Sequence, residues 1–157
     1  MAHDYFVGSV AYPYHLSIGG ILLNDRNEVC CHYFKHIEIA GLSATDLYLL
    51  MRETIHPNET IEQCLAGDLL AYVGSLITTF PRKGVTIQKT TLYFTARLQE
   101  GVSLSRSTQD IEGTSEVCWH SLDFLIEKVK GRQLGGYGID ESEVLERVKS
   151  HVESLKR

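Results

Sequence analysis

The sequence has no apolar stretch long enough to cross a membrane and no excess of basic residues. A membrane-spanning helix needs about 18 or more consecutive apolar residues, and no run in these 157 residues approaches that length. The formal net charge is -5, which argues against general binding to nucleic acid or to a membrane surface. A nucleotide pocket is compatible with this charge, because it needs only a few local Lys or Arg residues.

The cysteines lack the spacings that build disulfide frameworks and zinc sites. There are four of them and no C-x-x-C pair, and the adjacent Cys30 and Cys31 would point to opposite faces of a strand. Reduced thiols are typical of a cytoplasmic protein, and the cytoplasm is the expected location. The N-terminal residues show no basic flank followed by an apolar core, so no signal peptide is expected.

What is present is the composition of an ordinary globular protein. Hydrophobic residues make up 43% and charged residues 22% of the chain, which is typical of a sequence that buries a core. At this length we expect one domain over residues 1–157.

Strand patterns dominate the first half of the chain. Residues 15–25 and 28–39 predict a hairpin that turns at Asp25, Arg26 and Asn27. Later apolar runs predict a mixed sheet with helices on both faces, an α/β arrangement. The remaining predicted strands are at 47–52, 75–80 and 116–121, and residues 85–98 form a long strand or a bent pair of strands. The remaining helices are at 121–131, with Ser121 as cap, and from about Asp140. Loops are predicted at 39–46 and 99–115, and turns at 53–58 and 81–84.

The clearest helix prediction covers residues 60–74. Thr60 and Gln63 have the spacing of a capping box, apolar residues follow at helical spacing, and Gly74 suits the C-terminal end. Gly67 is out of place in this helix, since an interior Gly costs about 1 kcal/mol relative to Ala.

Four segments follow one another in a characteristic order. They are HLSIGGILLND (15–25), LMRETIHPNETIEQCLAGDLLAYVG (50–74), TTLYFTARL (90–98) and EVCWHSLDFL (116–125). They resemble the first core strand, the signature loop–helix–loop, the following strand and the late Trp-containing segment of the Nudix hydrolase family. The resemblance covers most of residues 15–130. It implies an α/β (α+β) fold, an αβα sandwich in which helices flank a mixed β-sheet.

The family's signature box is only partly retained. It consists of Gly, five residues, Glu, seven residues, Arg-Glu, an aliphatic residue, any residue, Glu-Glu, any residue, Gly and an aliphatic residue. When its first Glu is placed on Glu59, Leu69 and Gly74 also match, and Asp68 matches in charge. Other residues stand at the opening Gly, the Arg and the two late Glu positions: Glu53, Gly67, Ala71 and Tyr72.

The resemblance implies hydrolysis of a nucleoside diphosphate linked to another group, by attack of water on phosphorus assisted by Mg²⁺ or Mn²⁺. The expected catalytic residues are Glu59, Asp68 and Glu112, with Glu59 and Asp68 as metal ligands. On a helix, positions 67, 68, 71 and 72 would form one patch, with Asp68 as its single carboxylate. The alternative is that Glu59 merely favours a helix N-terminus and that Asp68 and Glu112 are solvated.

Arg52, Arg82 and His56 are the residues expected to bind the substrate, and surface solubility is the alternative for the two arginines. A small nucleotide is the expected partner, and the resemblance leaves a homodimer open. The missing box residues also support a second reading, a catalytically inactive Nudix-fold module that binds a nucleotide or a protein partner. A third reading is an unrelated α/β domain that matches by chance.

Overall fold

The computed structural model describes residues 8–39, 42–56, 58–65, 67–98, 111–133 and 139–156. Within these residues, six strands form one sheet in the order β4-β5-β1-β3-β2-β6. β1 and β5 run parallel and the other neighbouring strands are antiparallel, so the sheet is mixed. The strands are β1 (Tyr14–Leu23), β2 (Val29–Ile39), β3 (Leu42–Thr54), β4 (Gly67–Arg82), β5 (Val85–Leu98) and β6 (Glu116–His120).

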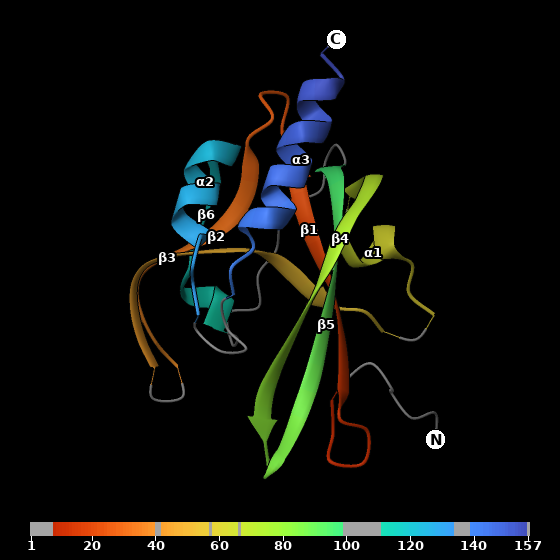
Figure 1. Ribbon diagram of the computed structural model, residues 1–157, viewed down its shortest axis with the longest axis vertical. Helices are drawn as coiled ribbons and strands as arrows, with labels where there is room; N and C mark the ends of the chain where they lie inside the picture. The colour runs from red at the N-terminus through yellow and green to blue at the C-terminus, as the bar shows by residue number, and fades with distance from the viewer. Residues whose placement is uncertain are drawn as a thin grey trace.

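Helices cover both faces of this sheet (Figure 1). The short α1 (Ile61–Leu65) packs on one face, which we call the α1 face. α2 (Leu122–Val129) and α3 (Ser142–Ser154) pack together on the other, the α2/α3 face. A 3-10 turn (Ile111–Thr114) precedes β6. The predicted mixed sheet between layers of helices is therefore confirmed.

Alternation along the central strands divides the core into two parts. Ile21 and Tyr93 are fully buried beneath α2 and α3, whereas Ile18 and Phe94 contact α1, because successive side chains of a strand point to opposite faces. Gly19 makes room for Tyr93, since a Cβ at this glycine would lie 2.5 Å from the tyrosine ring.

The first hairpin forms as predicted. Leu23 pairs with Val29 across the turn. The side-chain Oδ1 of Asn24 accepts hydrogen bonds from the backbone N–H groups of Arg26 and Glu28, each at 2.9 Å, which is how Asn stabilises turns. The loop predicted at 39–46 was wrong at residue 39 and from residue 42 onward, because β2 extends to Ile39 and β3 begins at Leu42 and pairs there with β2.

The chain departs most from the prediction after α1. The helix predicted over 60–74 was wrong beyond Leu65, because Gly67 begins the long strand β4. β4 pairs with β5 along its whole length. Lys83 and Gly84 join the two strands with φ values of 48° and 77°, and two consecutive positive φ values are typical of a type I′ hairpin turn. β5 coincides with the strand predicted at 85–98.

The C-terminal helices begin close to the predicted positions. Ser121 caps α2 by accepting a hydrogen bond from the N–H of Phe124 at 3.3 Å. α3 begins at Ser142, whose N–H donates to the carboxylate of Asp140 at 2.9 Å. Of the helices that the structure describes, none has the length and apolar character that a membrane span requires.

Candidate functional site

The turn before α1 brings two of the predicted site residues together. The N–H of His56 donates to Glu59 Oε2 at 3.0 Å, and the N–H of Glu59 donates to the carbonyl of His56 at 3.1 Å. The capping box is confirmed, with the N–H of Thr60 donating to Gln63 Oε1 at 2.9 Å and the N–H of Gln63 donating to Thr60 Oγ1 at 3.2 Å. These contacts fix Glu59 immediately before the first turn of α1.

Two carboxylates lie near one thiol on the α1 face. Burial raises the pKa of Cys64, and the negative charges of Glu59 and then Glu53 add to the effect, which brings the pKa to about 11. Glu53 pairs in register with Ile18, which contacts α1, and directly paired residues share a face of the sheet. Glu53, the residue that stands at the opening Gly of the signature box, therefore lies on the α1 face, and Glu59 lies in the turn before α1.

Asp68 lies on the other side of the sheet. It belongs to β4 and pairs directly with Arg97 of β5, whose side chain faces Val152 of α3 across a small hollow. Asp68 is therefore on the α2/α3 face, and the structure does not bring it together with Glu59. The single patch expected from positions 67, 68, 71 and 72 was wrong, because these positions alternate along a bulged strand instead of sharing one helix face.

The other predicted residues are also dispersed. Arg82 ends β4, 14 residues after Asp68 (82 − 68), or about 45 Å along an extended strand, and its Nη1 donates to the carbonyl of Gly8 at 2.8 Å. Glu112 falls in the 3-10 turn before β6, but its side chain lies outside what the structure describes.

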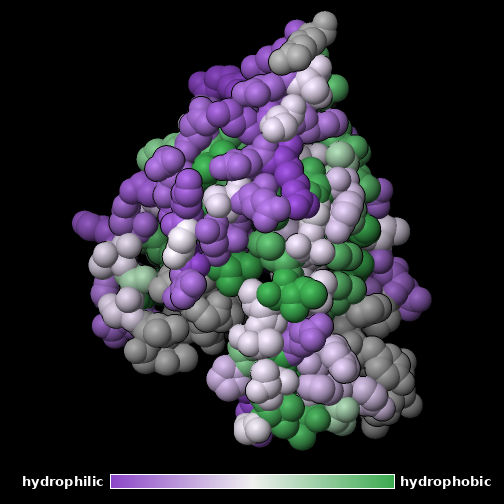
Figure 2. Space-filling model, in the orientation of Figure 1, coloured by the Kyte–Doolittle hydropathy of each residue, from purple (hydrophilic) through white to green (hydrophobic). Residues whose placement is uncertain are grey.

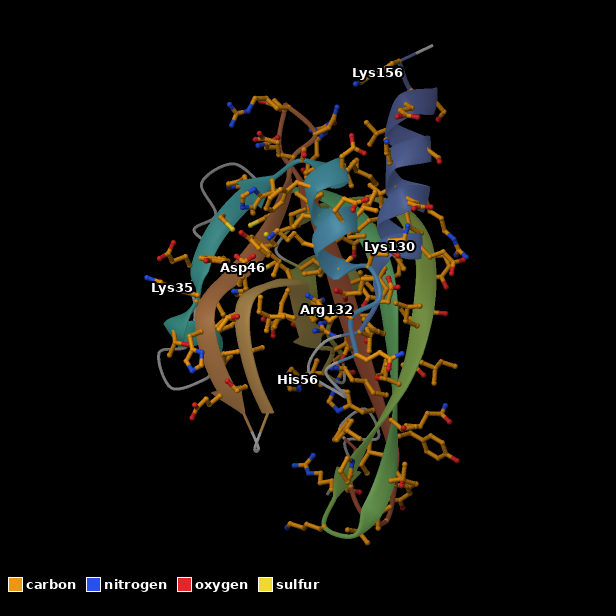
Figure 3. The ribbon with its side chains drawn as sticks, turned by 60° about the vertical axis from the view of Figure 1, so that its left-hand side comes forward. Lys35, Asp46, His56, Lys130, Arg132 and Lys156 are labelled. Carbon is orange, nitrogen blue, oxygen red and sulfur yellow. The ribbon has the colours of Figure 1, made fainter. Side chains whose placement is uncertain are left out.

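Arg52 lies at the end of β3 near a buried charged cluster that the sequence did not reveal. Tyr93 Oη donates to Glu141 Oε1 at 2.5 Å, and Arg132 Nη2 lies 3.2 Å from Glu141 Oε2. Arg132 Nη1 donates to the carbonyl of Tyr48. In Figure 3, Arg132 points inward between the strands and the helices. We call Tyr93, Arg132 and Glu141 the buried triad.

The environment of the buried triad shifts its ionisation. Burial lowers the pKa of Arg132, the charge of Glu141 opposes this shift, and the charge of Arg52 adds to it. Burial and then the charge of Glu141 raise the pKa of Tyr93. Arg132 Nε is buried and has no hydrogen-bond partner among the described residues. The charge of Arg52 therefore acts on the buried triad from the end of β3.

A divalent ion does not fit the box positions. Mg²⁺ takes hard oxygen ligands gathered around one point, whereas Ala71 and Tyr72 supply no carboxylate and Asp68 faces away from α1. In the part of the chain that the structure describes, no three side chains of His, Cys, Asp or Glu are placed to hold a metal ion together.

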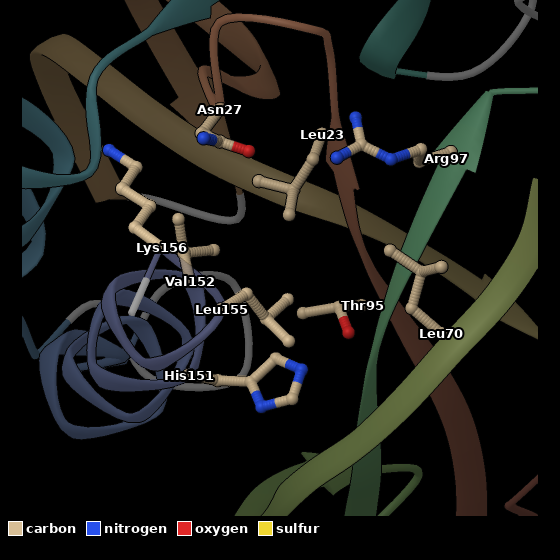
Figure 4. Close-up of a pocket in the computed structure, with 9 residues that line it drawn as sticks. All are labelled: Leu23, Asn27, Leu70, Thr95, Arg97, His151, Val152, Leu155 and Lys156. Atoms are coloured by element: carbon tan, nitrogen blue, oxygen red, sulfur yellow. The ribbon is translucent and has the colours of Figure 1, made fainter.

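A small hollow of about 280 Å³ lies between α3 and the start of the β4–β5 hairpin (Figure 4). Its floor is aliphatic, and three basic side chains, Arg97, His151 and Lys156, stand around it. The sequence did not predict it, because its walls come from four separate elements. The residues that line it are Leu23, Asn27, Leu70, Thr95, Arg97, His151, Val152, Leu155 and Lys156.

Comparison with known proteins identifies structures with a similar fold but no protein with a matching sequence. No protein-family model matches the sequence. No curated protein matches it either.

Solved structures share the arrangement of strands and helices. The solution structure of the E. coli ORF135 protein has a TM-score of 0.53 and 13% identity, covering 90% of this chain and 92% of that one. The MutT protein from Methanosarcina mazei Go1 has a TM-score of 0.52 and 16% identity, covering 92% and 99%. Because the identities are this low, the likeness concerns the fold alone. Together with the mixed sheet between helices, these comparisons show that the chain has the Nudix fold.

Proposed function

We propose that this protein binds a nucleoside diphosphate derivative on its Nudix frame and does not hydrolyse it through the signature box. One observation carries the proposal. The helix that would present the metal ligands ends at Leu65, and positions 68, 71 and 72 continue as a β-strand. A strand sends neighbouring side chains to opposite faces, so it cannot gather them as a helix does.

The basic groups near the end of β3 support binding of an anionic ligand. Arg52 is half-buried there, and its charge acts on Arg132 and Tyr93 of the buried triad. Arg suits phosphate because its planar guanidinium donates two parallel hydrogen bonds. His56 lies four residues further along the chain and completes the set of residues that we propose for binding. Arg82 is at the far end of β4 and is left out of it.

Binding is tested by isothermal titration calorimetry in the presence of EDTA. The probes are a nucleoside diphosphate, a nucleoside diphosphate sugar and a dinucleoside polyphosphate. We expect saturable binding of at least one probe, weakened about tenfold or more by Arg52→Met. Arg26→Met is the matched control, because Arg26 is an exposed arginine paired with Glu28 in the β1–β2 turn. No binding, or equal binding by both variants, would contradict the proposal.

A second candidate function is hydrolysis by a different carboxylate pair. The observation that favours it is that Glu53 lies on the α1 face of the sheet and Glu59 lies in the turn before α1. Two carboxylates are enough for Mg²⁺ when the substrate supplies phosphate oxygens, and the bound ion would neutralise diphosphate charge. Glu112, expected from the sequence as a third catalytic residue, stays a prediction.

A hydrolysis assay with Mg²⁺ or Mn²⁺ separates the two candidates. If Glu53 and Glu59 hold the ion, Glu59→Gln abolishes turnover and Asp68→Ala preserves it. Binding without turnover supports the first candidate. Turnover that is lost in Asp68→Ala would contradict both, because it would require Asp68 of the signature box to act in hydrolysis.

A further inference from the structure

β4 is an edge strand of unusual length. It runs for 16 residues, and its neighbour in the sheet is β5. Among the described residues, no strand pairs with its outer side. An open edge presents unpaired backbone N–H and C=O groups, which can pair with another chain.

The sequence of this edge has few of the features that prevent such pairing. Natural edge strands carry charged residues, especially Lys, or Pro, whereas no charged residue occurs from Leu69 to Phe80 and the proline of β4, Pro81, is its penultimate residue. Several large apolar side chains are exposed along the strand, with Ile77 at 64% and Tyr72 at 56%. Figure 2 shows hydrophobic side chains at the surface along the β4–β5 side of the molecule.

Only part of the edge is open. The register of β4 against β5 shifts between Leu69 and Ala71 and again between Tyr72 and Gly74, and bulges of this kind hinder pairing. Arg147 of α3 also reaches this part of the strand, with its Nη1 3.4 Å from the carbonyl of Val73. After Gly74 the register is regular to the end of the strand.

We propose that residues 75–79 of β4 pair antiparallel with the same residues of a second copy of this chain, which joins two sheets into one. The charges of β4 favour this occupant. Its two charged residues, Asp68 and Arg82, lie at opposite ends, so antiparallel pairing directs the acidic end of each strand toward the basic end of its partner. Parallel pairing would place like charges together.

Two-fold symmetry makes the interface self-complementary. If residue i of the first copy pairs with residue j of the second, then residue j of the first copy pairs with residue i of the second. One residue at the two-fold axis therefore pairs with its own counterpart. Ile77 is central in the open segment, so the exposed Ile77 side chains of both copies meet on one face of the joined sheet. Apolar pairs of this type stabilise adjacent strands.

Sedimentation velocity over a concentration series tests the proposal with the full chain. We expect a reversible dimer whose dissociation constant rises about tenfold or more in Ile77→Lys. Leu155→Lys is the control, because Leu155 is 73% exposed at the end of α3 and away from this edge. Since both side chains are exposed, neither change removes a core contact.

Hydrogen exchange locates the contact. Amides of residues 75–79 should gain protection as the protein concentration rises, and the gain should disappear in Ile77→Lys. A monomer at every concentration would overturn the proposal. The partner of the β4 edge would then be a strand of another protein. A dimer that Ile77→Lys and Leu155→Lys affect equally would also overturn it.

Discussion

The buried triad makes a strong prediction about stability. Glu141 is fully buried at the N-terminal end of α3, and the side chain of Arg132 is 8% exposed. The change Glu141→Gln preserves the size of the side chain but removes its charge. Arg132 then keeps its positive charge in the interior without its paired carboxylate, and Arg52 lies close enough to add repulsion.

The expected magnitude follows from the cost of an uncompensated buried charge. Removing one partner of a buried ion pair typically costs about 3–5 kcal/mol, and the hydrogen bond from Tyr93 is weakened as well. We therefore expect Glu141→Gln to lower the free energy of unfolding by about 3 kcal/mol or more.

The matched control is the exposed pair Arg147–Glu143 on α3. Its atoms are 2.6 Å apart, closer than those of the buried pair, but the side chains are 55% and 72% exposed. Exposed helix pairs of this spacing contribute about 0.3–0.5 kcal/mol, so Glu143→Gln should change the urea midpoint little. If urea unfolding gives a loss below about 1 kcal/mol for Glu141→Gln, similar to the control, the reasoning from burial is refuted.

Two further predictions concern packing and pH. Gly19→Ala places a methyl group 2.5 Å from the ring of Tyr93 and should cost about 1–3 kcal/mol in urea unfolding; an unchanged midpoint would show that the ring moves freely. Burial raises the pKa of Cys30 from 9.0 to about 12, so the folded protein holds this proton after the unfolded chain has lost it. The resulting stabilisation is complete below pH 9 and is lost as the pH rises toward about 12. Urea midpoints in that range should fall less steeply for Cys30→Ala than for the wild type, and equal slopes would contradict the assignment.

The fold was predictable where local patterns and long-range pairing agree. β1, β2, β5, β6 and α2 all have unambiguous local signals, from the Asn24 turn to the Ser121 cap. Residues 67–74 do not, because a short apolar run fits a helix or a strand equally well. Pairing with β5 makes these residues a strand, since pairing with a partner strand overrides local propensity. Gly67 was a signal against the helix, because an interior Gly is unfavourable there. In the strand the glycine fits, since a Cβ at this position would lie 3.1 Å from the carbonyl of Arg97.

The turn before α1 is the part of the candidate site that could be predicted from the sequence. Glu59 and His56 share a turn whose cap can be read from neighbouring residues. The buried triad joins residues 93, 132 and 141, and no spacing in the sequence indicates that they meet. Asp68 is displaced because pairing with β5 makes its segment a strand, and a helix and a strand send the same residue in different directions.

The parallel pairing of β1 with β5 also has a consequence for how the chain is made. Tyr14 pairs with Gln88 (88 − 14 = 74 residues apart), and contacts of such sequence separation form slowly. During synthesis the hairpins of β1, β2 and β3 can assemble early, while one side of the central strand waits for β5. Until the β4–β5 hairpin emerges and docks, β1 is an open edge of the partly formed sheet. This interval is when mispairing and capture by chaperones are most to be expected.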